Sequence, residues 1–229
     1  MSPESRSVAN ERCILLLGGS FDPVHNGHIG LARYFCTLLH PDELRLIPAG
    51  RPWQKPAMIA APEHRIAMLE LAFANWVIPV HIDTQEIERD GPSYAIDTLH
   101  TVRQAVGDQV SLVWVIGADQ LINLHTWHQW QSLFSLTNFC IAARPGYELN
   151  REDLNDEVAA EISRRQASPA QLRASPAGLC FIATHLALDV SSSALRAALS
   201  SNSARQAPQG LLPAPVLDYA QQHYLYQTT

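Results

Sequence analysis

The sequence predicts an α/β fold with a doubly wound parallel sheet. Short apolar runs alternate with amphipathic runs along the chain, and Gly, Pro or Ser turns punctuate this alternation. Three conspicuous turns, after Leu17, Ile116 and Ala143, would lie at the carboxyl edge of such a sheet, where ligands bind. We therefore expect the functional site at that edge.

The alternation assigns the elements in chain order. The runs expected to form strands are 13–17, 44–48, 77–87, 110–116, 139–143 and 180–183. The runs expected to form helices are 29–39, a stretch opened by Pro62 and Glu63, 94–106, 127–136, 192–199 and 214–223. Ser93 is the expected N-cap of the helix over 94–106. In the helix that Pro62 opens, apolar side chains recur at helical spacing: Ile66, Leu69, Leu71 and Phe73.

These elements predict a single domain over residues 13–229. Residues 1–12 are polar and lack the apolar core of a signal peptide, so we expect a disordered N-terminal extension. Residues 147–177 are polar, rich in Ala and interrupted by Ser and Pro, which indicates a variable helical insert or loop. Residues 190–229 are expected to form a small helical C-terminal part.

The composition indicates a globular, cytoplasmic protein. Hydrophobic residues make up 47% of the 229 residues and charged residues 17%, which is ample material for a core. The formal net charge of −6 gives no general basic footprint, so neither nucleic acid nor an anionic membrane is an expected partner. No apolar run approaches the ~18 residues that span a bilayer. The four cysteines are widely spaced, without a C-x-x-C pair, and are expected to be buried reduced thiols.

One glycine-rich stretch, residues 18–28, can bind phosphate. It follows the first expected strand and precedes the first expected helix, so backbone N–H groups and a helix dipole would face an anion. Within it, His25 and His28 lie three residues apart and would face the same side of a helix that begins near Asn26. A Walker A loop is excluded because the only lysine, Lys55, precedes Pro56. This stretch alone leaves a phosphate site and a tight turn both open.

The stretch resembles the signature of the nucleotidyltransferase superfamily, a G-G-x-F-D-P loop followed by H/T-x-G-H. A second segment, from Val190 to Arg196, is similar to the I-S-S-x-x-I-R signature near the C-terminus of that superfamily. Two independent segments in the right order are far more specific than either one. The resemblance implies a Rossmann-like sheet of the nucleotidyltransferase type.

The residue types in these segments suit in-line transfer of a nucleotidyl group. The α-phosphate under attack becomes more negative, so donors aimed at it lower the barrier. The loop amides, His25, His28 and Arg196 are such donors and are the expected catalytic residues. Mg²⁺ is the expected cofactor, bound mainly through the ATP phosphates, and no protein ligand is assigned to it. Asp22 is expected to fix the loop as a hydrogen-bond acceptor rather than to bind metal.

Within the superfamily, the chain most closely resembles the bacterial nicotinate-nucleotide adenylyltransferases, from about residue 13 to 226. That resemblance implies transfer of AMP from ATP to nicotinate mononucleotide, giving deamido-NAD and pyrophosphate in NAD biosynthesis. It assigns ATP binding to Gly18, Gly19, Ser20, Phe21, His28, Gly117, Asp119, Arg144, Ser192 and Arg196. It assigns mononucleotide binding to Lys55, Tyr94, Ala95, Trp127 and His128, with Trp127 stacked on the pyridine ring. A monomer or a homodimer is expected.

Two departures and two alternatives accompany this interpretation. Ala95 stands where the family often has Thr, and Gln54 stands where its basic loop often has His. A phosphopantetheine adenylyltransferase shares both signatures, and a non-catalytic nucleotide-binding module could use the same fold. His125 and His128 form a second His-x-x-His pair, but without a third ligand they are expected to lie at the surface or the pocket rim.

Overall fold

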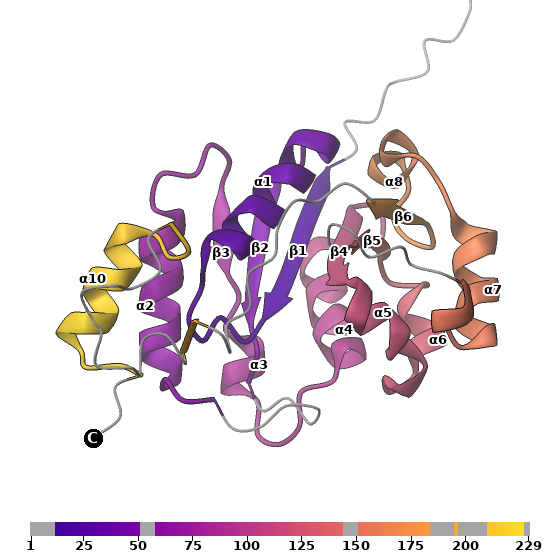
Figure 1. Cartoon of the computed structure of the whole chain (residues 1–229). Coiled ribbons are helices and arrows are strands. Elements are labelled where there is room, and N and C mark those ends of the chain that lie inside the picture. The colour runs from indigo at the N-terminus through magenta and orange to yellow at the C-terminus, as the bar shows by residue number, and fades with distance from the viewer. Residues whose placement is uncertain (1–11, 51–57, 144–150, 184–194, 197–209, 227–229) are drawn as a thin grey trace, which may run out of the picture.

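Figure 1 shows the computed structural model of the chain, a six-stranded parallel sheet with helices packed around it. The structure describes residues 12–50, 58–143, 151–183, 195–196 and 210–226. The strand order is β3-β2-β1-β4-β5-β6, and every neighbouring pair is parallel. This order confirms the predicted doubly wound sheet.

The helices and strands have the following bounds. The strands are β1 (Cys13–Gly19), β2 (Glu43–Pro48), β3 (Val80–Ile82), β4 (Ser111–Gly117), β5 (Asn138–Ala142) and β6 (Cys180–Ala183). The helices of the N-terminal half are α1 (Asn26–Leu39), α2 (Pro62–Phe73), α3 (Gln85–Glu88) and α4 (Ala95–Val106). Those of the C-terminal half are α5 (Ala118–Ile122), α6 (Trp130–Leu133), α7 (Asp156–Arg165), α8 (Pro169–Ala174) and α10 (Ala214–Gln222). Two 3-10 turns, η1 (Leu124–Thr126) and η2 (Arg151–Asp153), complete the set.

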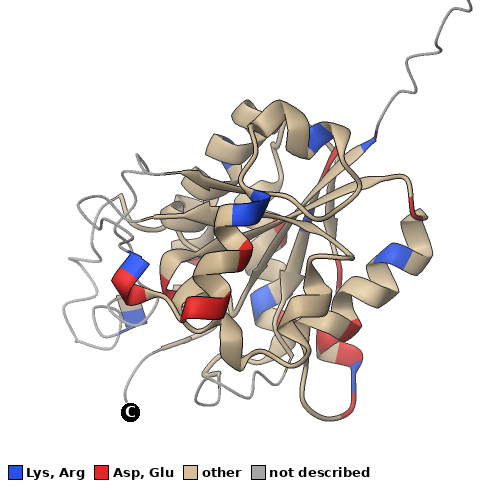
Figure 2. Ribbon diagram, turned by 90° about the vertical axis from the view of Figure 1, so that its right-hand side faces the viewer, with Lys and Arg blue, Asp and Glu red and all other residues tan. Residues whose placement is uncertain are grey.

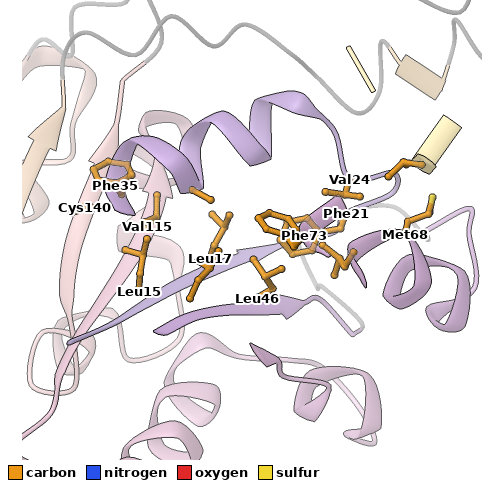
Figure 3. Packing of buried hydrophobic residues seen from close by; sticks show 14 of the residues in the cluster. Leu15, Leu17, Phe21, Val24, Phe35, Leu46, Met68, Phe73, Val115 and Cys140 are labelled. Carbon is orange, nitrogen blue, oxygen red and sulfur yellow. The ribbon is translucent and has the colours of Figure 1, made fainter. Parts of the chain in front are cut away.

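Two hydrophobic cores lie on opposite faces of the sheet because side chains alternate along each strand. On β1, Leu15 and Leu17 pack in the core that α1, α2, α8 and α10 cover, whereas Ile14 and Leu16 pack with α4, α5, α6 and α7. Figure 3 shows the first core, with Phe35 of α1 near one end of it. Strands buried on both faces carry near-continuous apolar runs, which is how the sequence reveals them.

The β3 strand is much shorter than expected. The predicted strand over 77–87 is wrong beyond Val80–Ile82, and the helix α3 occupies Gln85–Glu88. Asp83 ends the strand: its side-chain Oδ1 accepts a hydrogen bond from the backbone N of Gln85 at 3.2 Å. Such a local bond turns the chain and competes with continued pairing.

The helix expected over 127–136 is also shorter than predicted. Gln129 has a left-handed backbone with φ of 51°, so α6 begins only at Trp130 and the 3-10 turn η1 precedes it. The short helix α5 after β4 was not expected. In the variable region, α7 and α8 show that the part after residue 150 is helical. Most of the helix expected over 192–199, like residues 1–11, lies outside the described residues.

No helix among the described residues combines the length and apolar character needed to cross a membrane. All four cysteines are free thiols: Cys13, Cys140 and Cys180 are buried and Cys36 is half-buried. Burial raises the pKa of the Cys36 thiol to about 11, so this thiol is protonated and unreactive near neutral pH.

Candidate active site

The candidate site lies at the carboxyl ends of β1 and β4, where the strand order reverses. Leu17 pairs with Val115 in the ladder, so the two glycine turns that follow lie at the same edge of the sheet. After β1 the chain enters α1 on one face, and after β4 it enters α5 on the other. The fold therefore brings together the two turns that the sequence singled out.

The loop after β1 presents backbone rather than side chains. Gly18, Gly19 and Ser20 are half-buried, whereas the residues on either side of them are buried. A Cβ on Gly18 would lie 3.3 Å from the Trp114 ring, and one on Gly19 would lie 3.1 Å from the Phe21 ring. The absence of these Cβ atoms lets the backbone pass closely over the sheet edge and be approached by a ligand.

The carbonyl oxygens of this loop are held by donors of the protein. Ala49 N donates to Gly19 O at 2.8 Å, Arg65 Nη1 to Ser20 O at 2.8 Å and Arg196 Nη1 to Asp22 O at 2.7 Å. Because carbonyl oxygens carry partial negative charge, turning them into the protein removes a source of repulsion for a phosphate.

Asp22 fixes the loop, as the sequence led us to expect. Its side chain is 2% exposed. Its carboxylate accepts hydrogen bonds from Ile59 N at 2.8 Å, from Ala60 N at 3.1 Å and from Tyr226 Oη at 2.7 Å. One carboxylate therefore joins the glycine loop, the chain that leads into α2 and Tyr226 in the segment after α10.

The two histidines of the motif stack on each other but differ in exposure. Their ring centroids are 3.7 Å apart, with an angle of 25° between the planes. His25 is only 4% exposed, and burial lowers its pKa to about 4, so it is neutral at physiological pH. His28 is half-buried, and its Nδ1 accepts a hydrogen bond from His25 N at 3.3 Å. With Nδ1 an acceptor, neutral His28 carries its proton on Nε2 and can donate from there.

Phe21, expected among the ATP-binding residues, is fully buried. Its φ of 48° places the backbone in the left-handed region, and its ring meets the His28 ring edge-on at 4.9 Å. Figure 3 shows Phe21 and Val24 at the same end of the core as Met68 of α2. Phe21 therefore shapes the loop from inside, and the exposed backbone is that of the three preceding residues.

The turn after β4 carries Gly117 and Asp119, which the resemblance assigns to ATP binding. Gly117 N donates to Gln120 Oε1 at 2.9 Å, and Asp119 is exposed in the first turn of α5. A Cβ on Gly117 would lie 2.5 Å from Asp119 Oδ1. The glycine therefore leaves room for the carboxylate to fold back toward the turn.

Two of the residues assigned to the mononucleotide, Tyr94 and His128, meet at the start of α4. Ala95 is the first residue of α4, so the N–H groups of that turn have no partner within the helix. The rings of Tyr94 and His128 lie 4.9 Å apart, which places the segment after η1 against this helix start. Trp127 is half-buried, and within the described part of the chain its buried Nε1 has no hydrogen-bond partner. A helix N-terminus beside an indole suits a flat ring that carries a carboxylate.

Arg196, from the second signature, reaches the glycine loop across 174 residues of sequence through its bond to Asp22 O. The structure therefore brings Arg196 of the second signature segment to the first segment. Three assigned residues, Lys55, Arg144 and Ser192, lie outside the described residues.

Three buried polar residues were missed by the sequence reasoning. Arg65 and Tyr226 contact the glycine loop as described above. Glu86 is buried and accepts from Thr98 Oγ1 at 2.8 Å, and burial raises the pKa of its carboxyl group. For Arg65 the sequence holds a signal: it lies three and four residues before Met68 and Leu69, on the apolar face of its helix.

These features define a nucleotide-binding α/β site of the nucleotidyltransferase class. Residues 16–198 match the family described as cytidylyltransferase-like. The fold agrees with a solved structure of Plasmodium falciparum nicotinic acid mononucleotide adenylyltransferase complexed with NaAD, with a TM-score of 0.71 and 17% sequence identity. That likeness covers 94% of this chain and 98% of the other.

Two relatives define the family more narrowly. A protein of Herminiimonas arsenicoxydans named "Probable nicotinate-nucleotide adenylyltransferase" is 49% identical over 95% of this chain and 98% of its own length. A protein of the same name from Marinomonas sp. (strain MWYL1) is 36% identical over 93% of this chain and 94% of its own length. The chain belongs to the family of nicotinate-nucleotide adenylyltransferases.

Proposed function

We propose that this chain transfers AMP from ATP to nicotinate mononucleotide and forms nicotinate adenine dinucleotide and pyrophosphate. The observation that carries the proposal is the meeting of two subsites at one sheet edge. One is the glycine loop with His28, which suits a triphosphate, and the other is the start of α4, where Tyr94 meets His128, which suits a pyridine carboxylate.

The reaction is a single in-line displacement. A phosphate oxygen of the mononucleotide attacks the α-phosphorus of ATP and forms the new P–O–P bridge, while the bond from that phosphorus to the α,β-bridging oxygen breaks. The electron pair leaves with pyrophosphate. Because the attacking phosphate is already ionised at neutral pH, the step needs no covalent intermediate and no strong general base.

The described residues supply donors for the charge that develops. His28 Nε2–H and the backbone of residues 18–20 would stabilise the equatorial oxygens of the α-phosphate. Arg196 Nη1 is committed to the Asp22 carbonyl, so a phosphate contact would come from its other N–H groups. His25, neutral and nearly enclosed, would support His28 through ring stacking.

The mononucleotide would lie between α4 and Trp127. Backbone N–H groups near Ala95 and His128 would bind the nicotinate carboxylate, with Tyr94 alongside and the indole against the ring. A backbone contact does not depend on the hydroxyl group that Ala95 lacks. Lys55 is proposed to contact phosphate.

The Mg²⁺ that this chemistry uses is proposed to bind mainly through the ATP phosphates. Nucleotidyltransferases generally use a divalent metal with ATP, where it neutralises charge on the phosphates. Among the described residues there is no group of three His, Cys, Asp or Glu side chains that could hold a metal. Both oxygens of Asp22 already accept bonds from the protein, which fits a site whose metal ligands are phosphate and water oxygens.

We also propose that residues 13–229 form one domain that acts as a monomer or a homodimer. Strands from both halves of the chain belong to one sheet, and α10 packs beside α2, which supports a single unit (Figure 1). Size-exclusion chromatography with light scattering would give the oligomeric state.

The proposal is tested by measuring pyrophosphate release from ATP with two acceptors, nicotinate mononucleotide and phosphopantetheine. We expect release with the mononucleotide and formation of nicotinate adenine dinucleotide, identified by mass. Release with phosphopantetheine alone would favour the alternative adenylyltransferase, and release with neither would favour a non-catalytic nucleotide-binding module.

A further inference from the structure

Arg65 lies inside the protein directly behind the glycine loop. It belongs to α2 and is only 1% exposed, among the apolar side chains of the first core. Its Nη1 donates to the Ser20 carbonyl, and its buried Nε has no partner within the described residues. Figure 2 shows the Arg residues of the described ranges spread over several elements, and among them only Arg65 and Arg103 are buried.

A buried guanidinium is unfavourable unless its surroundings compensate for lost hydration. Here the compensation comes from the loop itself, through the Ser20 carbonyl, and from the nearby carboxylate of Asp22. Tyr226 also contributes to the electrostatic environment of Arg65. An apolar residue would fill this position on α2 without needing such compensation for lost hydration. Stability alone therefore does not explain an arginine here.

The contact with Ser20 bears directly on phosphate binding. Ser20 is the last of the three half-buried residues of the loop, and the Arg65 bond directs its carbonyl oxygen into the protein. Without that donor, the peptide between Ser20 and Phe21 could rotate and turn a partial negative charge toward the phosphate.

We infer that Arg65 is a positioning residue for AMP transfer, which holds the Ser20 peptide so that the glycine loop is preorganised for ATP. This inference rests on the proposed function. Arg65 is not a catalytic residue, because a side chain buried to this degree does not reach substrate. It acts through the loop, at the cost of keeping a cation in the core.

Arg103 provides a matched control within the same chain. It is 8% exposed and donates to the carbonyl oxygens of Gly107, Val110, Leu136 and Pro176. These carbonyls lie near the amino ends of β4, β5 and β6, at the edge opposite the site. Arg103→Met therefore removes a buried guanidinium that binds backbone carbonyls without touching the glycine loop.

The test compares Arg65→Met and Arg65→Lys with Arg103→Met and Arg103→Lys. For each, the thermal midpoint, the Kd for ATP by calorimetry, and kcat and KM for pyrophosphate release are measured. We expect both Met variants to lose stability. Only Arg65→Met should also weaken ATP binding about tenfold and lower kcat about 30-fold, because a loop displaced by a fraction of an ångström misplaces the α-phosphate. The KM for the mononucleotide should change less than about twofold. Arg65→Lys should show a smaller but measurable loss, about threefold in ATP affinity and in kcat, because lysine keeps the charge but not the geometry of the guanidinium.

Equal ATP affinity and equal kcat in Arg65→Met and Arg103→Met would overturn the inference. If the Met variants do not fold, the Lys pair decides: a fall in ATP affinity and kcat confined to Arg65→Lys supports it, and equal values contradict it. A wild-type protein that binds ATP but does not use nicotinate mononucleotide would contradict the proposed function. The ATP affinities of the four variants would then still test whether Arg65 positions the glycine loop.

Discussion

His25 and His28 are three residues apart in the motif, yet the structure gives them different environments. The half-buried His28 has its Nδ1 occupied by the backbone N–H of His25, which leaves Nε2 as the donor. His25 is enclosed beneath it and neutral. One histidine is therefore suited to contact phosphate and the other to support it.

We predict that His28→Ala lowers kcat by at least about a hundredfold, because it removes a donor to the charge that develops on the α-phosphate. The loss of stability should be about 1 kcal/mol, from the missing bond to His25 N at the start of α1. Steady-state pyrophosphate release and urea unfolding measure the two effects. His125→Ala, an exposed histidine beyond β4, is the control and should keep wild-type kcat. Near-normal turnover in His28→Ala would contradict the role of His28 as a donor to the α-phosphate.

His25 predicts a dependence of stability on pH. Its pKa is about 4 in the folded protein and about 6.5 in the unfolded chain, so between these values the unfolded state takes up a proton that the folded state does not. The free energy of unfolding should therefore fall as pH decreases, by about 2.5 kcal/mol from this residue between about pH 7.5 and about pH 4.5.

The measurement is urea unfolding of wild type and His25→Asn across that range. Other titrating groups contribute to both proteins, so the difference between them isolates His25. The wild type should lose more stability than the variant on acidification. Parallel pH profiles would show that His25 does not avoid protonation in the folded state.

At the scale of elements, α10 contributes to the site although it lies beside α2, away from the sheet edge (Figure 1). Its core residues Val216 and Ala220 pack in the first core, and the chain that follows it places Tyr226 against Asp22. Burial and the nearby carboxylate raise the pKa of Tyr226, so its hydroxyl remains a donor. Tyr226 thus attaches the C-terminal part to the phosphate loop through a buried charge, in addition to the bond from Arg196 to Asp22 O.

We predict that Tyr226→Phe lowers the free energy of unfolding by about 1.5–3 kcal/mol, the range for a hydrogen bond to a charged group. Because Asp22 holds the loop, kcat should also fall severalfold. Tyr219→Phe is the control: Tyr219 Oη bonds His64 Nδ1 between α10 and α2, at 3.0 Å and away from the loop. That variant should lose about 1 kcal/mol and keep its activity. A larger activity loss in Tyr219→Phe than in Tyr226→Phe would contradict the assignment.

At the scale of the whole molecule, the reversal of strand order brings the loop after β1 and the turn after β4 to one edge, and the crossover from β3 to β4 brings in the start of α4.

We predict from this arrangement that nicotinate mononucleotide is preferred over nicotinamide mononucleotide. A nicotinate carboxylate gains charge-assisted hydrogen bonds from the N–H groups at the start of α4, and nicotinamide does not. The ratio of kcat/KM should favour nicotinate mononucleotide by about tenfold or more, with the KM for ATP unchanged. Equal rates with the two mononucleotides would contradict this prediction.

Much of the fold follows from short stretches of sequence. The apolar runs at β1, β4 and β5 locate strands, because a strand buried on both faces must be apolar throughout. The short elements are harder to predict: the boundary between β3 and α3 lies at Asp83, whose side chain accepts hydrogen bonds from Gln85, and α6 begins after the left-handed Gln129. A local propensity pattern does not contain such contacts.

Contiguous stretches of the chain are enough to establish the α/β class, the glycine loop with its two histidines, and the family. These depend on contiguous residues, whose backbone freedom and periodicity can be read locally. Three features emerge only when the chain packs: His25 is enclosed while His28 is half-buried, Arg65 is buried behind Ser20, and Tyr226 bonds to Asp22 across 204 residues. Such contacts arise where separate segments pack together and exclude water, and burial then determines the pKa and the hydrogen bonds of each polar group.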